Sequence, residues 1–308
     1  MPFSHHSHSG QFCHHATNTL EEMLLTAISR KMRVFALTEH MPRDLPEDLY
    51  PEEVAVGVTP ESLFRTFKEY YTEAIRLREK YRGTIEVLVG FEGDWIRKED
   101  GKGNSRVIIE GLLQKYEFDF FLGSIHHVHA VPIDLDHTLY AKAQSLSGGT
   151  EERLFEDYFD AQLDMLKALK PQVVGHFDLI RLKSVDPNGS FKRWNGVWKK
   201  IVRNLEFVAT YGGMLELNSA SLRKGMDEPY PKGEICETFV EKGGRFCFSD
   251  DSHAVEQVGL NYGKVVQFIE KFGIKEIYYL QSDEKGIGNT TVSVIAVSQL
   301  QNDAFYAT

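Results

Sequence analysis

Short apolar runs alternate with helical patterns along almost the whole chain, and this alternation limits the fold more than any other feature. Six runs have the continuous apolar character of strands that are buried on both faces. They are RVFALTEH (33–40), TIEVLVGFE (84–92), FDFFLGSIH (118–126), PQVVGHFD (171–178), GMLELNS (213–219) and RFCFSDD (245–251). With the N-terminal stretch they make seven expected core strands, and a further strand, KEIYYL, follows the last helical pattern.

The segments between these strands predict helices. In TNTLEEMLLTAISRKM (17–32), Thr and Asn precede Glu21 and Glu22, which suits the start of a helix. In the segment 59–81, Thr59 is the expected cap and Pro60 the first helical residue. Further helices are expected near 104–115, 150–169, 191–211, 232–242 and 255–272. Repeated strand–helix units predict a parallel α/β architecture, and we expect a single domain over 1–308 because no linker or repeat divides the chain.

The composition excludes several classes of protein. Of 308 residues, 42% are hydrophobic and 26% are charged, as in ordinary globular proteins. A net charge of −10 argues against a nucleic-acid-binding surface. No apolar run is long enough for a transmembrane helix, and no secretory leader is visible. The three cysteines, Cys13, Cys236 and Cys247, form neither a disulfide framework nor a Cys-x-x-Cys site. We expect a cytoplasmic protein without nucleic-acid or membrane partners, and the oligomeric state stays open.

Residues that bind metals or act as acids and bases gather where the expected strands end. These residues are His6, His8, Glu39, His40, Glu92, His126, His127, His176, Asp178, Glu216, Asn218, Asp250, Asp251 and His253. The strands of a parallel barrel direct their C-terminal ends to one face, where barrel enzymes build their sites. Residues spread over most of the chain are therefore expected to meet in one pocket.

The types of residue in this set point to metal ions. Neutral imidazole and carboxylate suit zinc, iron and manganese. In His6-x-His8 both rings point to the same side of an extended chain, so they can hold one ion, and Asp251-x-His253 has the same spacing. A carboxylate such as Glu92 can bridge two ions. Ions held close together lower the pKa of a bound water and clamp a phosphate. Glu39 is expected to support the site rather than to take part in the reaction.

The ordered set of motifs resembles the polymerase-and-histidinol-phosphatase (PHP) family over nearly the whole chain. The motifs are His6-x-His8, Thr38-Glu39-His40, Gly90-Phe91-Glu92, Gly123-Ser124-Ile125-His126, Gly175-His176-Phe177-Asp178-Leu179 and Ser249-Asp250-Asp251-x-His253. FCHHATNTLEEML, GHFDLIR and LELNSASLRKG resemble segments of its monofunctional histidinol-phosphatase branch. This resemblance implies a distorted (β/α)7 TIM-like barrel with a trinuclear metal centre. It also implies hydrolysis of L-histidinol phosphate to L-histidinol and phosphate in histidine biosynthesis.

The resemblance also implies how the ligands are shared among three divalent ions. The first ion falls to His6, His8, Glu92 and Asp251, the second to Glu92, His126 and His176, and the third to His15, His40 and His253. Two choices stay open, because His14 is adjacent to His15 and Asp250 to Asp251. Zinc is the expected metal, and iron and manganese are alternatives.

Arg181 and Arg223 match arginines that bind phosphate in the family, and a guanidinium can donate two hydrogen bonds to phosphate oxygens. The expected reaction is direct attack on phosphorus by a hydroxide that bridges the metals. Glu92, Asp251 and His127 form the expected catalytic set, with either His127 or a metal-bound water as proton donor. Loops near 41–60 and 127–150 are expected to shape the pocket.

Two other functions were weighed. A phosphoesterase of the same superfamily could act on nucleotides or nucleic acid, but the acidic balance and the lack of a basic stripe count against it. A metal-binding protein without catalytic activity could keep the fold, but the apparently complete ligand set counts against it.

Overall fold

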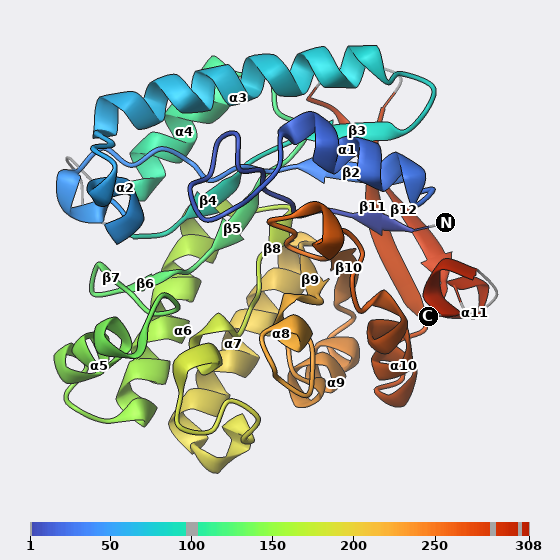
Figure 1. The fold of residues 1–308 in the computed structure, drawn as a ribbon. Coiled ribbons are helices and arrows are strands. Elements are labelled where there is room, and N and C mark those ends of the chain that lie inside the picture. The colour runs from blue at the N-terminus through green and yellow to red at the C-terminus, as the bar shows by residue number, and fades with distance from the viewer. Residues whose placement is uncertain (1, 97–103, 284–287, 301–303, 308) are drawn as a thin grey trace.

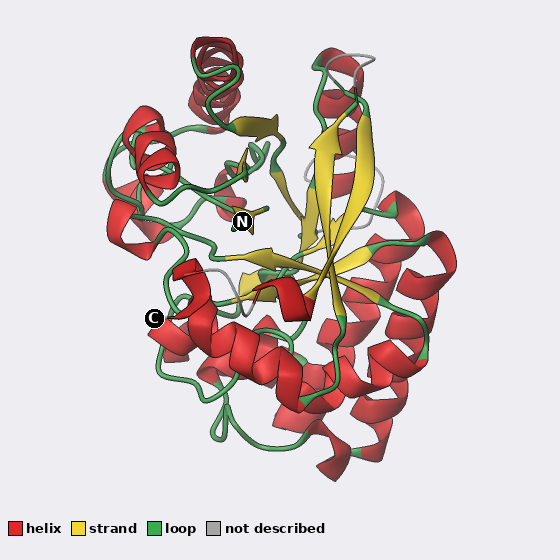
Figure 2. Cartoon of the chain, turned by 90° about the vertical axis from the view of Figure 1, so that its right-hand side faces the viewer, coloured by secondary structure: helices red, strands yellow, loops and turns green. Residues whose placement is uncertain are grey.

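Parallel strands form the centre of the molecule, and helices surround them (Figures 1 and 2). The structure, a computed structural model, describes residues 2–96, 104–283, 288–300 and 304–307. The strands of the central layer are β1 (Phe3–Ser4), β2 (Val34–Leu37), β3 (Glu86–Val89), β4 (Glu92–Asp94), β5 (Leu122–Ser124), β8 (Val173–Val174), β9 (Met214–Asn218) and β10 (Arg245–Ser249). They pair in the orders β1-β2-β3 and β10-β9-β8-β5-β4, and every pair is parallel.

Two seams join these sheets into a barrel. At one seam the amide of His5 donates to the carbonyl of Phe248 at 3.2 Å, and Ser7 forms a parallel bridge with Ser252. At the other seam the end of β2 continues to His40, which forms a parallel bridge with Glu92. If β3 and β4 are taken as one interrupted strand, the ring has the seven strands that the sequence predicts. The α/β barrel is therefore confirmed.

The expected helices are present on the outside of the barrel. They are α1 (Leu20–Ser29), α3 (Pro60–Lys80), α4 (Ser105–Lys115), α6 (Glu151–Leu169), α7 (Asn195–Tyr211), α9 (Gly233–Glu241) and α10 (Tyr262–Lys271). Thr19 caps α1 by accepting from the amide of Glu22, and Thr59 caps α3 in the same way from Ser62. The helix expected at 255–272 begins late, because 255–257 form a 3-10 turn and Asn261 has a left-handed backbone (φ 65°).

Further elements lie in the connections. They are α2 (Pro51–Ala55), the hairpin of β6 (His127–Val128) and β7 (Val131–Pro132), α5 (His137–Leu146), α8 (Ala220–Arg223), α11 (Val297–Leu300), and 3-10 turns at Pro46–Asp48, Leu179–Lys183, Phe191–Arg193, Val255–Gln257 and Ala304–Ala307. The two expected loops, 41–60 and 127–150, thus contain short helices and a hairpin.

A long antiparallel hairpin follows the barrel. The expected strand KEIYYL lies in β11 (Glu276–Ser282), which pairs with β12 (Thr290–Ala296). The hairpin packs against β10 and β3, and in Figure 2 it forms the two long strands of the cartoon. The sequence did not predict β12, because its polar and apolar residues are mixed. The side chains of Val292 and Val294 are exposed on it.

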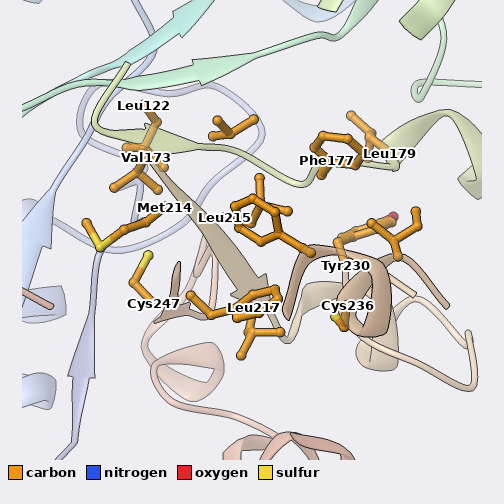
Figure 3. Close-up of a cluster of buried hydrophobic side chains, with 14 of the residues drawn as sticks. Leu122, Val173, Phe177, Leu179, Met214, Leu215, Leu217, Tyr230, Cys236 and Cys247 are labelled. Carbon is orange, nitrogen blue, oxygen red and sulfur yellow. The ribbon is translucent and has the colours of Figure 1, made fainter. Parts of the chain in front are cut away.

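Apolar side chains fill the space between the barrel and its helices. Figure 3 shows part of this core, in which Leu215 and Leu217 of β9 lie among residues of neighbouring strands and of the segment around Phe177. Burial of such side chains contributes roughly 1.5–3 kcal/mol each to folding. Among the described helices, none has the length and apolar character that crossing a bilayer would require.

Tyr70 of α3 ties two strands together, which generates a stability prediction. Its buried hydroxyl lies 2.7 Å from the carbonyl oxygen of Leu37 and 2.6 Å from that of Gly90, so it donates to either one. We expect Tyr70→Phe to lower the free energy of unfolding by about 1–3 kcal/mol, because two buried carbonyls lose their shared donor. Tyr71→Phe is the matched control: its hydroxyl bonds the backbone of Glu117 at the surface. Urea unfolding of both variants is the measurement, and equal effects would contradict the assignment.

Candidate metal centre

The C-terminal ends of the barrel strands open on one cavity of about 350 Å³. Its lining includes His15, His40, Tyr50, Glu52, Glu92, His126, Asp134, Leu135, His176, Leu179, Arg223, Lys224, Asp251, His253 and Gln257. His6 and His8 lie beneath it and are fully buried. The structure brings together all nine residues that the sequence proposes as metal ligands. They form three groups, and a fourth combination of His8, His40 and Glu92 connects these groups.

The first group joins the N-terminus of the chain to the end of β10. The Nε2 atoms of His6 and His8 lie 3.0 Å apart. The Asp251 carboxylate oxygen Oδ1 lies 3.7 Å from the Nε2 atom of His6 and 3.6 Å from that of His8. Both rings therefore face one point together with a carboxylate, and this donor set suits a divalent ion such as zinc.

The second group joins Glu92, the first residue of β4, to His126 and His176, which follow β5 and β8. The Nε2 atoms of His126 and His176 lie 3.1 Å apart, and the Oε1 atom of Glu92 lies 3.4 Å and 3.0 Å from them. The other oxygen of Glu92, Oε2, lies 3.4 Å from His6 and 3.5 Å from His8. One carboxylate thus directs each of its oxygens to a different pair of histidines, which is the geometry of a bridging ligand.

The third group lies at the mouth of the cavity. The Nε2 atom of His15 lies 3.3 Å from that of His40 and 3.2 Å from the sulfur of Cys13. One ligand atom from each of Cys13, His15, His40 and His253 lies within 4.8 Å of the others. His40 connects this group to the other two, because its Nδ1 atom lies 2.9 Å from the Oε2 atom of Glu92.

Buried acids orient the histidines from behind. The Nδ1 atom of His6 lies 3.0 Å from a carboxylate oxygen of Glu216, and Asp94 accepts from the amide of His126 at 3.3 Å. A carboxylate that holds Nδ1–H leaves the lone pair of Nε2 free for a metal. The sequence analysis placed Glu216 at a strand end without a role and missed Asp94. Asp94 could have been found from its spacing, because it is two residues beyond Glu92 on an extended strand and so points to the same side.

Glu39 supports the site as expected and stands outside the ligand groups. One of its oxygens accepts from the amide of Ser9 at 2.8 Å and from the hydroxyl of Ser9 at 2.7 Å. The other oxygen lies 3.6 Å from the Nδ1 atom of His8. Glu39 therefore fixes the chain just after the first two histidines.

The surroundings shift the pKa values of these groups in different directions. Burial lowers the pKa of His8 to about 3 and holds that of His253 well below its usual value, so both rings are neutral, as metal ligands must be. Burial opposes the charge of Glu92, but the histidines around it outweigh burial and hold its pKa well below normal. Burial also opposes the charge of His126, but Glu92 and Asp94 raise its pKa to about 10. A bound ion would have to displace that proton.

The structure bears on both choices that the sequence left open. His15 belongs to the third group, whereas His14 belongs to no candidate metal group among the described residues. Asp251 faces the first group, whereas the carboxylate of Asp250 accepts from the amides of Ser252 and Gly259 at 3.0 and 2.6 Å. The backbone of Asp251 is left-handed (φ 48°), so the chain turns sharply between the two acids and sends their carboxylates in different directions.

Arg181 is not a free phosphate ligand, contrary to the expectation from the sequence. Its side chain is buried, and its Nε atom donates to Asp178 at 2.9 Å. The other nitrogens of the guanidinium donate to the carbonyls of Pro187, Glu228 and Pro229 and to the sulfur of Met226. These contacts tie a 3-10 turn to the segment before α9, so Arg181 holds loops together.

Arg223 lies on the cavity, at the end of the short helix α8 rather than in a loop. Its terminal nitrogens donate to the carbonyls of Asp250 and Asp251 at 2.7 and 2.6 Å. Lys224 lines the cavity beside it. Arg223 thus both fixes the turn that carries Asp251 and presents positive charge to the cavity.

His127, the candidate proton donor, is not among the described residues that line this cavity. Its ring stacks on Tyr50 at 6.0 Å between ring centroids, and its Nδ1 atom lies 2.9 Å from a carboxylate oxygen of Asp94. The ring lines a separate cavity together with Trp95. This arrangement therefore does not fit the expectation that His127 donates a proton to the substrate.

Comparison with known proteins agrees with the geometry. The family model described as PHP domain matches residues 4–220. The chain is 43% identical over 295 residues to a Schizosaccharomyces pombe protein named "Probable histidinol-phosphatase", covering 96% of this chain and 94% of the relative. It is 32% identical over 337 residues to the histidinol-phosphatase of Saccharomyces cerevisiae, with 99% of each covered.

A solved structure has the same fold. It is histidinol phosphate phosphatase from Lactococcus lactis, complexed with zinc, L-histidinol and phosphate. The TM-score is 0.68 at 20% sequence identity, over 94% of this chain and 98% of that one. The family match over residues 4–220 and the two long alignments leave one conclusion, which is that this chain belongs to the PHP domain family.

Proposed function

We propose that this protein is a histidinol-phosphatase, which hydrolyses L-histidinol phosphate to L-histidinol and phosphate in histidine biosynthesis. The observation that carries the proposal is the position of Glu92, with one oxygen toward His6 and His8 and the other toward His126 and His176. A carboxylate in this position can hold two ions close together, and such ions can activate water and clamp a phosphate. We infer the substrate from the names of two relatives that align with nearly the whole chain.

The donor groups fit three divalent ions. The proposed ligands are His6, His8, Glu92 and Asp251 for the first ion, Glu92, His126 and His176 for the second, and His15, His40 and His253 for the third. Zinc is the metal of choice, since the Lactococcus lactis enzyme is complexed with it and imidazole with carboxylate suits it. When bound, such ions activate water and neutralise charge on a phosphate.

The other residues of the cavity bind and orient the substrate. Arg223 donates to phosphate oxygens, and Lys224 adds positive charge beside it. Glu52 and Asp134 line the same cavity and face the cationic part of the substrate with their carboxylates. They come from the segments 41–60 and 127–150, which supports the proposal that these segments shape the substrate pocket. A cytoplasmic location and the lack of nucleic-acid partners stay predictions.

The first prediction concerns metal content. If the three groups each hold an ion, protein purified with zinc should contain close to three zinc ions per chain by elemental analysis. Removal of the ions with a chelator should abolish phosphate release, and added zinc should restore it. Fully active protein with one ion or fewer per chain would contradict the three-ion proposal.

The second prediction concerns the bridge. Glu92→Gln keeps the size of the side chain and removes the charge that two ions would share. We expect turnover of L-histidinol phosphate to fall roughly 100-fold or more, because changes behind the ligands alone cost about 10–100-fold. Elemental analysis should show lost metal as well. Turnover near that of the unmodified protein, with its full metal content, would remove Glu92 from the proposed role.

The third prediction separates the two arginines. Arg223→Lys keeps the charge and loses the planar two-point contact, so kcat/KM should fall about 10- to 150-fold, which corresponds to roughly 1.5–3 kcal/mol. Inhibition by inorganic phosphate should weaken in parallel.

Arg181→Lys is the matched comparison. It should lower the free energy of unfolding by about 1–3 kcal/mol, because several buried acceptors lose their donor, while the inhibition constant of phosphate stays unchanged. Steady-state kinetics measure kcat/KM and the inhibition constant of phosphate, and urea unfolding measures the free energy of unfolding of each variant. The assignment fails if Arg181→Lys weakens phosphate inhibition and Arg223→Lys does not.

A further inference from the structure

Cys13 is held against the metal centre by a tight turn. The amide of Cys13 donates to the carbonyl of Ser9 at 2.9 Å, and the amide of Ala16 donates to the carbonyl of Cys13 at 3.2 Å. At Gly10 a β-carbon would lie 2.7 Å from the α-carbon of Thr17, so only glycine lets this turn close on itself. The side chain of Cys13 is 6% exposed. Its place is thus fixed by the backbone between the first two metal-binding histidines and His15.

The sulfur of Cys13 points into the third group of ligands. It lies 3.2 Å from the Nε2 atom of His15, which in turn lies 3.3 Å from the Nε2 atom of His40. In a tetrahedral zinc site, with about 2.0–2.1 Å to nitrogen and 2.3 Å to sulfur, neighbouring ligand atoms lie roughly 3.3–3.6 Å apart. The observed distances are close to these values.

Each histidine of the group has its other ring nitrogen engaged. The Nδ1 atom of His15 lies 3.2 Å from a carboxylate oxygen of Glu52, and that of His40 lies 2.9 Å from Glu92. The Nδ1 atom of His253 lies 2.9 Å from the carbonyl oxygen of Asp251, to which it donates in the matching tautomer. The three Nε2 atoms are therefore the nitrogens left for an ion.

We propose that Cys13, as a thiolate, is the fourth protein ligand of the third ion, which makes this site three nitrogens and one sulfur. The thiol releases its proton to solvent when the ion binds. The inference rests on the proposed three-ion centre and adds a residue that the sequence analysis did not place there. It divides the centre into one site with a sulfur ligand and two sites with only nitrogen and oxygen ligands.

This division has a chemical consequence. A thiolate favours softer ions such as zinc, cobalt and cadmium over manganese and magnesium. The other two sites offer only imidazole and carboxylate donors, which accept a wider range of divalent ions. The third ion should therefore be the most selective of the three and the last to leave on mild chelation. The alternative is that Cys13 stays a thiol and donates a weak hydrogen bond to His15.

The test is the X-ray absorption spectrum of the zinc-loaded full chain. The proposal expects sulfur at about 2.3 Å from zinc, with one sulfur for every three zinc ions. Cys13→Ser should lose this sulfur signal completely. Cys236→Ala and Cys247→Ala are the controls and should keep it, because both thiols are packed in the apolar core (Figure 3) and neither belongs to a candidate metal group of the described residues.

A second readout uses cobalt. The cobalt-loaded protein should show a thiolate-to-cobalt charge-transfer band in the near ultraviolet, and Cys13→Ser should lack it. If Cys13→Ser does not fold, the spectrum of the unmodified protein still decides. Three zinc ions per chain without sulfur would overturn the role of Cys13 and leave the proposed function intact. Fewer than three zinc ions per chain, with no sulfur near zinc, would overturn both the three-ion centre and the role of Cys13.

Discussion

Glu92 is the point at which the barrel and the metal centre depend on each other. Its amide donates to the carbonyl of Glu39 at 3.0 Å, and its carbonyl accepts from the amide of Met41 at 2.9 Å, so its backbone joins the end of β2 to β4. Its carboxylate lies 2.9 Å from His40 and 3.0 Å from His176. A shift of this one residue would open a seam of the barrel and separate the ligand groups.

The buried charges explain why ions belong in this cavity. His6 and His126 have raised pKa values because acids surround them, whereas burial lowers the pKa of His8. Acids and imidazoles packed in a dry interior are costly unless positive charge balances the carboxylates. Protons do this in part, and divalent ions can replace them while binding the same nitrogens and oxygens. Folding of the barrel and loading of the centre should therefore be coupled.

The two arginines show where reasoning from sequence stops. Both follow strand ends, and both carry a group that suits phosphate. Arg223 lies on the cavity. Arg181 instead donates its hydrogen bonds to Asp178 and to backbone carbonyls of a segment more than 40 residues away. The position of an arginine relative to a strand end does not reveal which acceptors a distant loop brings to it. His127 illustrates the same point, because the ring of Tyr50 covers it.

The sequence by itself determined the alternation of strands and helices and placed acids and histidines at the strand ends, because apolar periodicity and residue type are local properties. Its resemblance to the PHP family implied the seven-stranded barrel and the place of Glu92 between two sets of histidines. Only the tertiary structure decided what lies behind and beside those ligands: Glu216 and Asp94 against the rings, the sulfur of Cys13 beside His15, and the burial of Arg181. These contacts join residues from distant parts of the chain or across a closed turn. They depend on the way in which strand ends and loops pack, which no local pattern encodes.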